Sequence, residues 1–224
     1  MDQSWDFRLR EELIRELGAI LKIYMGLENI KVPRNAHQGH QAALHVFADA
    51  SKQAFGVASY MVTIEGKCQL LTAMARVTPK RMLELDESQS IPKLVLNALL
   101  FGCRLAQYLI ELRPETYVST TVWFDASTAL QWVHSRQSTS PYVLNRVEEI
   151  NRIRLKCLLL LKHVPTSCNP ADLASRGVAA KVVLKSNLWL HGPAWLIDVS
   201  ACPNQSIFPT EWEIKACPIR LLPP

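Results

Sequence analysis

Three aspartates occupy comparable places along the chain. Asp49 ends the segment HVFAD, Asp125 ends VWFD, and Asp172 lies within NPADLASR. We expect the first two to follow strands and the third to lie in the first turn of a helix. Sites form at strand ends of α/β sheets, and carboxylates meeting there repel one another unless a cation lies between them. Their hard oxygens suit Mg²⁺ or Mn²⁺, and two such ions about 4 Å apart can activate a water and stabilise the leaving oxygen of a phosphodiester.

Each aspartate also has a purely structural explanation. Asp49 and Asp125 suit turns, and Asp172 complements the positive end of a helix. The spacing alone does not decide between a shared site and three unrelated turns.

The surrounding elements must bring these residues together. Alternation and composition predict strands over 43–48, 54–63, 69–77, 117–124 and 158–164. Helices are expected over 91–112, 127–134 and 141–154, and from Asn169 as N-cap with Pro170 in the first turn. Residues 91–112 are apolar nearly all round, which predicts a buried helix with Pro92 in its first turn, after a charged loop over 80–90. This order predicts an α/β fold, a five-stranded mixed sheet flanked by helices.

Segments outside this pattern set the domain boundaries. Residues 5–25 repeat Leu and Ile at helical spacing, and the polar stretch 31–41 is typical of a linker. After about residue 180 the chain is rich in Pro and Trp, with little periodicity. We therefore expect a connector helix and linker over 1–42, the main domain over 43–180 and a tail over 181–224.

Composition excludes several classes of protein. The 224 residues carry 25 Lys+Arg against 20 Asp+Glu, a net charge of +5, and 49% are hydrophobic, which rules out disorder and coiled coil. We expect no membrane span, since no apolar run reaches about 18 residues. The charged N-terminus is unlike a signal peptide, so we expect an intracellular protein, cytoplasmic or nuclear rather than secreted, with six reduced cysteines.

A series of segments resembles a known family. In order they are HVFADASKQAFG, IPKLVLNALL, VWFDASTALQWV, NRVEEI, KHVPTSCNPADLASRG and NLWLHGPAWL, over roughly residues 43–196. The series is similar to the RNase H-like region of BEL/Pao-type LTR retrotransposon polyproteins. WDFRLREEL and KVPRN resemble that family's connector between reverse transcriptase and RNase H.

The resemblance implies an RNase H-like fold and a nuclease that hydrolyses the RNA strand of an RNA–DNA hybrid. It also implies two Mg²⁺ (or Mn²⁺) ions held by three aspartates and one glutamate. Asp49, Asp125 and Asp172 match the three aspartates as catalytic and metal-binding residues. The implied partners are the hybrid and the reverse transcriptase and integrase regions of a parent polyprotein.

One position departs from the family pattern. Where the family has a helix start like IPRLEL, this chain has IPKLVL, so Val95 replaces the glutamate. Valine has no lone pair to give a metal, and we expect a weak or inactive nuclease. Rescue by Glu84, Asp86 or Glu87 would need the loop before the helix to fold back over the site. Ala126 replaces the serine that commonly follows the second aspartate, a milder change. His163 lies too early for a catalytic loop histidine, and we expect it to face solvent or a backbone carbonyl.

Basic residues on the helix over 141–154 and just beyond it offer a nucleic-acid contact. Arg146, Arg152 and Lys156 could follow the phosphates of a hybrid, although a solvated helix face explains them as well. Two other functions stay open: a non-catalytic nucleic-acid-binding or interaction module, and a non-functional fragment of a decayed element.

Overall fold

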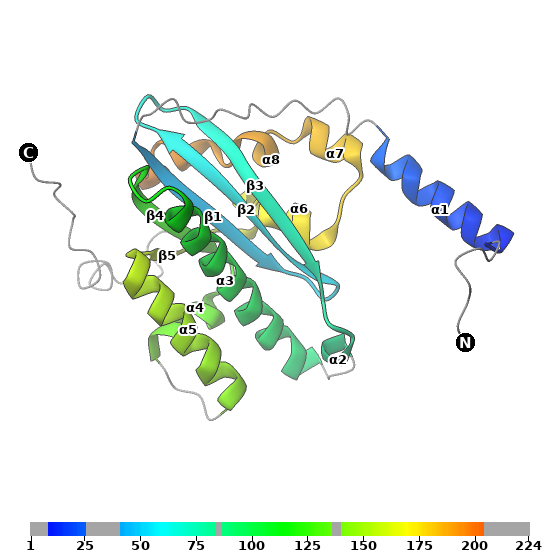
Figure 1. Ribbon diagram of the computed structural model, residues 1–224, viewed down its shortest axis with the longest axis horizontal. Helices are drawn as coiled ribbons and strands as arrows, with labels where there is room; N and C mark the ends of the chain where they lie inside the picture. Colours follow the sequence, from blue (N-terminus) through cyan, green and yellow to red (C-terminus); the bar gives the residue numbers. More distant parts are fainter. Residues whose placement is uncertain (1–8, 26–40, 84–86, 136–139, 204–224) are drawn as a thin grey trace, which may run out of the picture.

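The computed structural model describes residues 9–25, 41–83, 87–135 and 140–203. It has one five-stranded sheet with helices on both faces (Figure 1). The strands are β1 (Ala42–Ala50), β2 (Ala54–Thr63), β3 (Cys68–Val77), β4 (Tyr117–Phe124) and β5 (Leu160–His163). The helices are α1 (Glu11–Tyr24), α2 (Lys80–Leu83), α3 (Glu87–Leu112), α4 (Ser127–Ser135), α5 (Pro141–Cys157), α6 (Ala171–Arg176), α7 (Ala180–Lys185) and α8 (Asn187–His191).

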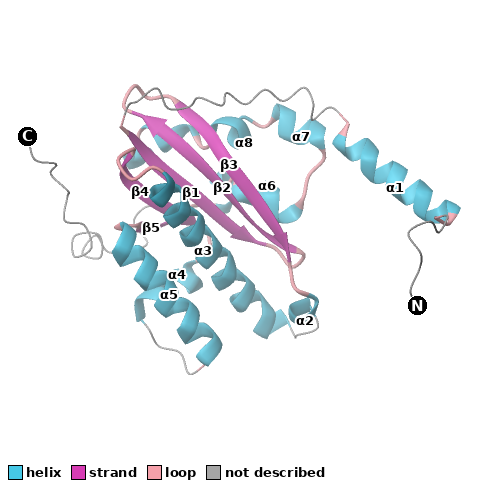
Figure 2. Ribbon diagram, viewed as in Figure 1, coloured by secondary structure: helices cyan, strands magenta, loops and turns pink. Residues whose placement is uncertain are grey.

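The sheet has the strand order β3-β2-β1-β4-β5. The first three strands form an antiparallel meander, whereas β4 and β5 run parallel to β1. This arrangement confirms the predicted RNase H-like α/β fold with its mixed sheet. Parallel neighbours require crossovers, and α3 makes the crossover between β3 and β4 while α4 and α5 make the next one (Figure 2).

Two apolar clusters cover the two faces of the sheet. Along β1, Leu44, Val46 and Ala48 belong to the cluster that packs beneath α3, α4 and α5. Phe47 belongs to the cluster on the opposite face, with Trp123 and Leu196. The alternation follows from the period of two in a strand, and it makes β1 a central strand buried on both sides.

Helix α3 is the central covering element of the first face. Gly102 allows it to approach closely, because an added Cβ would lie 3.1 Å from Ala48 Cβ and 3.3 Å from Val122 Cγ1. Within this helix, Ile91–Leu112 is long and apolar enough to span a membrane by length and composition, and 56% of its most apolar stretch is buried inside the protein. The core helix of a globular domain has the same properties, so this finding is weak evidence for a span. Residues 91–112 were predicted to form a buried helix rather than a span, since isolated charged residues such as Arg104 interrupt the apolar run.

Two predicted boundaries differ from the structure. Helix α3 begins at Glu87 rather than at residue 91, and the predicted loop also contains α2. Pro92 is therefore inside the helix, not in its first turn. Because proline has no backbone N–H, the hydrogen bond to the carbonyl of the residue four positions earlier is missing, close to the N-terminal end of α3. The first half of the predicted tail is helical, and Leu196 and Cys202 are buried in the second cluster.

The N-terminal helix is separate from these clusters. α1 buries none of its residues, and its apolar side chains, such as Leu17 and Ile20, are exposed. The linker predicted over 31–41 lies almost entirely outside the described residues, as do the first residues of the predicted helix over 5–25 and residues 204–224 of the predicted tail.

Candidate active site

Asp49 and Asp125 lie on neighbouring parallel strands at the same edge of the sheet. In the register of β1 and β4, Ala48 is opposite Phe124, and each aspartate is the next residue along the chain. Because parallel strands present their carboxyl ends together, this register brings two residues from distant parts of the sequence next to each other.

Helix α6 brings Asp172 to the same place. Asn169, which is 1% exposed, donates from Nδ2 to the carbonyl oxygen of Ala48 at 3.0 Å. Its Oδ1 accepts from the backbone N–H of Ala171 at 3.1 Å, although α6 begins at Ala171 and its N-cap residue is Pro170 rather than the predicted Asn169. One side chain thus joins the start of α6 to the residue before Asp49.

Glycine at position 56 allows α6 to lie directly on the sheet. Gly56 is paired with Asp49 across β1 and β2. An added Cβ would lie 2.6 Å from Ala174 Cβ and 2.8 Å from the backbone nitrogen of Ser175. The absence of a side chain at Gly56 therefore lets α6 approach the sheet closely.

Asp49 is the most buried of the three carboxylates, with 6% of its surface exposed. Ser175 Oγ donates a hydrogen bond to its Oδ2. Burial, together with the charges of Asp125 and Asp172, raises the pKa of Asp49 to about 6, although the hydrogen bond from Ser175 opposes the shift. The pKa of Asp49 therefore depends on the charges of both other carboxylates.

Asp125 is half-buried and behaves in the same way. Burial raises its pKa, a hydrogen bond from the side chain of Thr166 opposes this, and the charge of Asp172 adds to the rise. Its backbone carbonyl oxygen lies 3.0 Å from His163 Nε2. The expectation that His163 faces a backbone carbonyl is confirmed.

Asp172 has a cationic partner one helical turn away. Arg176 Nε donates to Asp172 Oδ1 at 2.6 Å. The hydrogen bond and charge of Asp172, and to a smaller extent the charges of Asp49 and Asp125, keep the pKa of Arg176 above its usual range. One arginine therefore partly balances three carboxylates.

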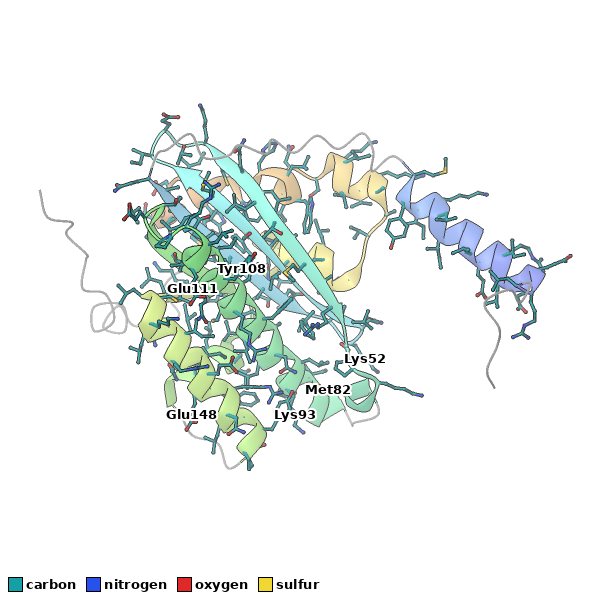
Figure 3. The ribbon with its side chains drawn as sticks, viewed as in Figure 1. Lys52, Met82, Lys93, Tyr108, Glu111 and Glu148 are labelled. Atoms are coloured by element: carbon teal, nitrogen blue, oxygen red, sulfur yellow. The ribbon has the colours of Figure 1, made fainter. Side chains whose placement is uncertain are left out.

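Val95 lies in the first half of α3. It is half-buried and packs against the cluster that contains Ala48 and Phe124. It precedes Gly102 by seven residues, so it lies on the same face of α3 about 10 Å nearer the start of the helix. Figure 3 shows Lys93, close to the start of α3, at the same end of the sheet as Lys52, which follows β1.

The three acidic residues that could replace the missing glutamate have no described side chains. Glu84 and Asp86 lie outside the described residues, and Glu87 begins α3 with a side chain that is not described. Ala126 is half-buried and packs against the same cluster as Val95.

The three aspartates fit a divalent cation in their chemistry. They are oxygen ligands from three segments, and their mutual repulsion favours a positive charge between them. In the arrangement described, however, no group of three or more His, Cys, Asp or Glu side chains is close enough to hold an ion within the described residues. Asp172 would have to exchange Arg176 for a metal.

The predicted basic contact on α5 is divided among different neighbours. Arg146 stacks on the ring of Tyr142, 3.4 Å from its centroid, and donates to Asn97 Oδ1 at 2.6 Å. Lys156 pairs with Glu111 at 2.6 Å, at the far end of α3 in Figure 3. Arg152 is exposed. Two of the three side chains therefore join α5 to neighbouring residues rather than forming one basic strip.

Two residues that support the site were not predicted to do so from the sequence: Ser175, which contacts Asp49, and Arg176, which contacts Asp172. The period of the helix could have indicated the second pair, because Asp172 and Arg176 are separated by four residues. The contact between Ser175 and Asp49 joins residues far apart in sequence and had no local signal.

Comparison with known proteins supplies the family. The model of the Pao retrotransposon-like RNaseH-like domain matches residues 1–126. The match contains Asp49, Val95 and Asp125, and it ends before α6 and Asp172. No curated protein sequence matches the chain.

Solved structures are similar at low identity. RNase H1 from Halobacterium salinarum is 8% identical, with 65% of this chain and 99% of that chain covered and a TM-score of 0.40. LC11-RNase H1 in complex with an RNA/DNA hybrid is 14% identical, over 64% and 99%, with a TM-score of 0.41. The foamy viral protease-reverse transcriptase in complex with dsDNA is 12% identical, over 71% and 30%, with a TM-score of 0.48.

Proposed function

Because this chain belongs to the family of Pao retrotransposon-like RNaseH-like domains, we propose that it descends from a two-metal nuclease that hydrolyses the RNA strand of RNA–DNA hybrids. We further propose that its own nuclease activity is strongly weakened or lost. Both parts are supported by the edge of the sheet that carries Asp49 and Asp125, with Asp172 on the adjoining helix α6, and by the valine, Val95, that stands on α3 in place of the family's glutamate.

The three aspartates are the residues that would hold Mg²⁺ or Mn²⁺. Bound there, the metals would supply an activated water and stabilise the charge on the leaving oxygen. The chain itself contributes the placement of the ligands. The register of β1 and β4 fixes Asp49 beside Asp125, and Asn169 fixes the start of α6, which carries Asp172.

The loss of the glutamate explains why the activity should be low. Removing a group that merely supports a metal ligand typically costs about 10–100-fold in metal affinity or activity. A missing ligand at a two-metal site should cost at least as much. Arg176 adds to this effect, because its ion pair with Asp172 competes with a metal for the same oxygen.

A cleavage assay on an RNA–DNA hybrid tests the proposal. The protein is incubated with a labelled hybrid in Mg²⁺ and separately in Mn²⁺, with Asp125→Asn as the control for contaminating nuclease. We expect at most weak cleavage that Asp125→Asn abolishes. Cleavage that persists in Asp125→Asn would contradict the assignment of the site, and fast cleavage by the parent chain would contradict the predicted impairment.

A non-catalytic nucleic-acid-binding module is the second candidate. It is favoured by the ion pair between Arg176 and Asp172, which lowers the negative charge of the site without a metal. Such a module would bind the hybrid in the presence of a chelator and cleave nothing. A fluorescence anisotropy titration of labelled hybrid in EDTA, beside the cleavage assay, separates the two candidates. Binding that requires metal would count against the module.

A further inference from the structure

Ser175 is in direct contact with the most buried carboxylate of the candidate site. It is 1% exposed, and its Oγ donates to Asp49 Oδ2. The same Oγ lies 3.2 Å from the carbonyl oxygen of Asp172. A hydroxyl has one proton, and an ionised carboxylate is the stronger acceptor, so the proton of Ser175 belongs on Asp49.

The backbone of Ser175 is held on two sides. Ser51, just after β1, donates from Oγ to the carbonyl oxygen of Ser175 at 2.7 Å. On the other side α6 lies against Gly56, where an added Cβ would approach within 2.8 Å of the nitrogen of Ser175. The hydroxyl is therefore presented to Asp49 from a fixed position.

The contact limits how the carboxylate of Asp49 can turn. The carboxylate accepts one hydrogen bond from Ser175 and one from the backbone N–H of Ala50. A carboxylate offers about four lone-pair positions, so two remain for other partners. With both donors in place, these two positions keep a constant direction relative to Asp125 and Asp172.

We infer that Ser175 is a positioning residue, which fixes the carboxylate of Asp49 in the orientation that binds a divalent cation. The inference rests on the proposed function, because it concerns the same metal-binding carboxylates. It adds a residue that acts through Asp49 and that would not itself contact the ion. Alanine would fill nearly the same space at position 175 but could not donate.

The first test measures metal affinity in the Val95→Glu background, which has the complete set of family ligands. Isothermal titration with Mn²⁺ compares Val95→Glu with the double variants that add Ser175→Ala or Ser59→Ala. Ser59→Ala is the matched control, since Ser59 is also a buried serine, but its hydroxyl donates to the carbonyl oxygen of Thr72 rather than to Asp49. We expect Ser175→Ala to weaken Mn²⁺ binding by about 10–100-fold, and Ser59→Ala to leave it close to the parent value.

The second test examines the contact without metal. Urea midpoints in EDTA are compared for Ser175→Ala in the native sequence and in the Asp49→Ala background. If the hydroxyl acts through Asp49, Ser175→Ala lowers the midpoint in the native sequence and has little effect once Asp49 is gone. A merely structural serine would lower the midpoint equally in both.

The outcomes separate this inference from the proposed function. If Val95→Glu binds no Mn²⁺, the proposed function fails. If Val95→Glu binds Mn²⁺ and Ser175→Ala does not weaken it, or if the two midpoint shifts are equal, the positioning role of Ser175 is overturned while the metal site stands.

Discussion

A methyl group added at Gly56 should displace α6 without touching any charged residue. In Gly56→Ala the new Cβ would lie 2.6 Å from Ala174 Cβ, 2.8 Å from Ser175 nitrogen and 3.0 Å from the carbonyl carbon of Ala174, whereas ordinary contact begins at 3.4 Å. Two of these three atoms belong to the backbone, so no rotamer change relieves the clash. The helix must retreat by roughly 0.8 Å, the difference between the ordinary and the closest contact.

The expected effect of Gly56→Ala follows from this displacement. Overpacking of this kind costs about 1–3 kcal/mol, and the free energy of unfolding in urea should fall by that amount. The movement also separates Asp172 from Asp49, so Mn²⁺ binding in the Val95→Glu background should weaken.

Gly18→Ala is the matched control for this glycine prediction. Nothing lies within 4 Å of a Cβ added at Gly18 on the exposed helix α1. Alanine favours a helix over glycine by about 1 kcal/mol, so this variant should be as stable as the parent or more stable. If Gly56→Ala unfolds at the same urea concentration as the parent chain, the predicted displacement of α6 is refuted.

Two further predictions concern pH and salt. The pKa of Asp49 is 3.8 in an ordinary environment and about 6 in the folded protein, so the contribution of Asp49 to stability is complete below pH 4 and is lost as the pH rises to 6. Asp49→Asn should remove this loss of stability between pH 4 and pH 7, as urea unfolding at the two pH values would measure. The same loss in Asp49→Asn as in the parent would contradict this prediction. Replacing Arg146, Arg152 and Lys156 by Gln should weaken hybrid binding. The slope of log binding constant against log salt concentration should fall by about 1 for each phosphate that the protein no longer neutralises, as anisotropy between 50 and 200 mM salt would measure. Unchanged binding would refute a basic contact on α5.

Much of the fold was predictable because its signals are local. Alternating apolar residues predicted all five strands within two residues of their observed ends, and the order of the elements predicted the mixed sheet. The start of α3 was not predictable in this way, because Pro92 and the charged residues before it are typical of a boundary. The fold of residues 187–203 was also missed, since Leu196 is buried by a distant part of the sheet rather than by a periodic neighbour.

The sequence suggested the aspartates of the candidate site but not the residues that contact them. Asp49 and Asp125 were suggested by their positions at strand ends, and the parallel register brings them together. The state of Asp172 depends on Arg176, and that of Asp49 on Ser175, 126 residues away in the sequence. The assignment of Arg146, Arg152 and Lys156 to nucleic acid remains a prediction, and the structure gives two of these residues partners within the protein.

The effect of Val95 on activity is measured most directly by the rate of RNA–DNA hybrid cleavage by Val95→Glu relative to the parent chain. Val95→Gln serves as the control, because glutamine has a similar shape and lacks the second carboxylate oxygen. We expect Val95→Glu to cleave at least about 10-fold faster than both the parent and Val95→Gln in Mg²⁺ or Mn²⁺. A parent chain that cleaves as fast as Val95→Glu, or a Val95→Glu variant that binds Mn²⁺ and still cleaves nothing, would contradict it.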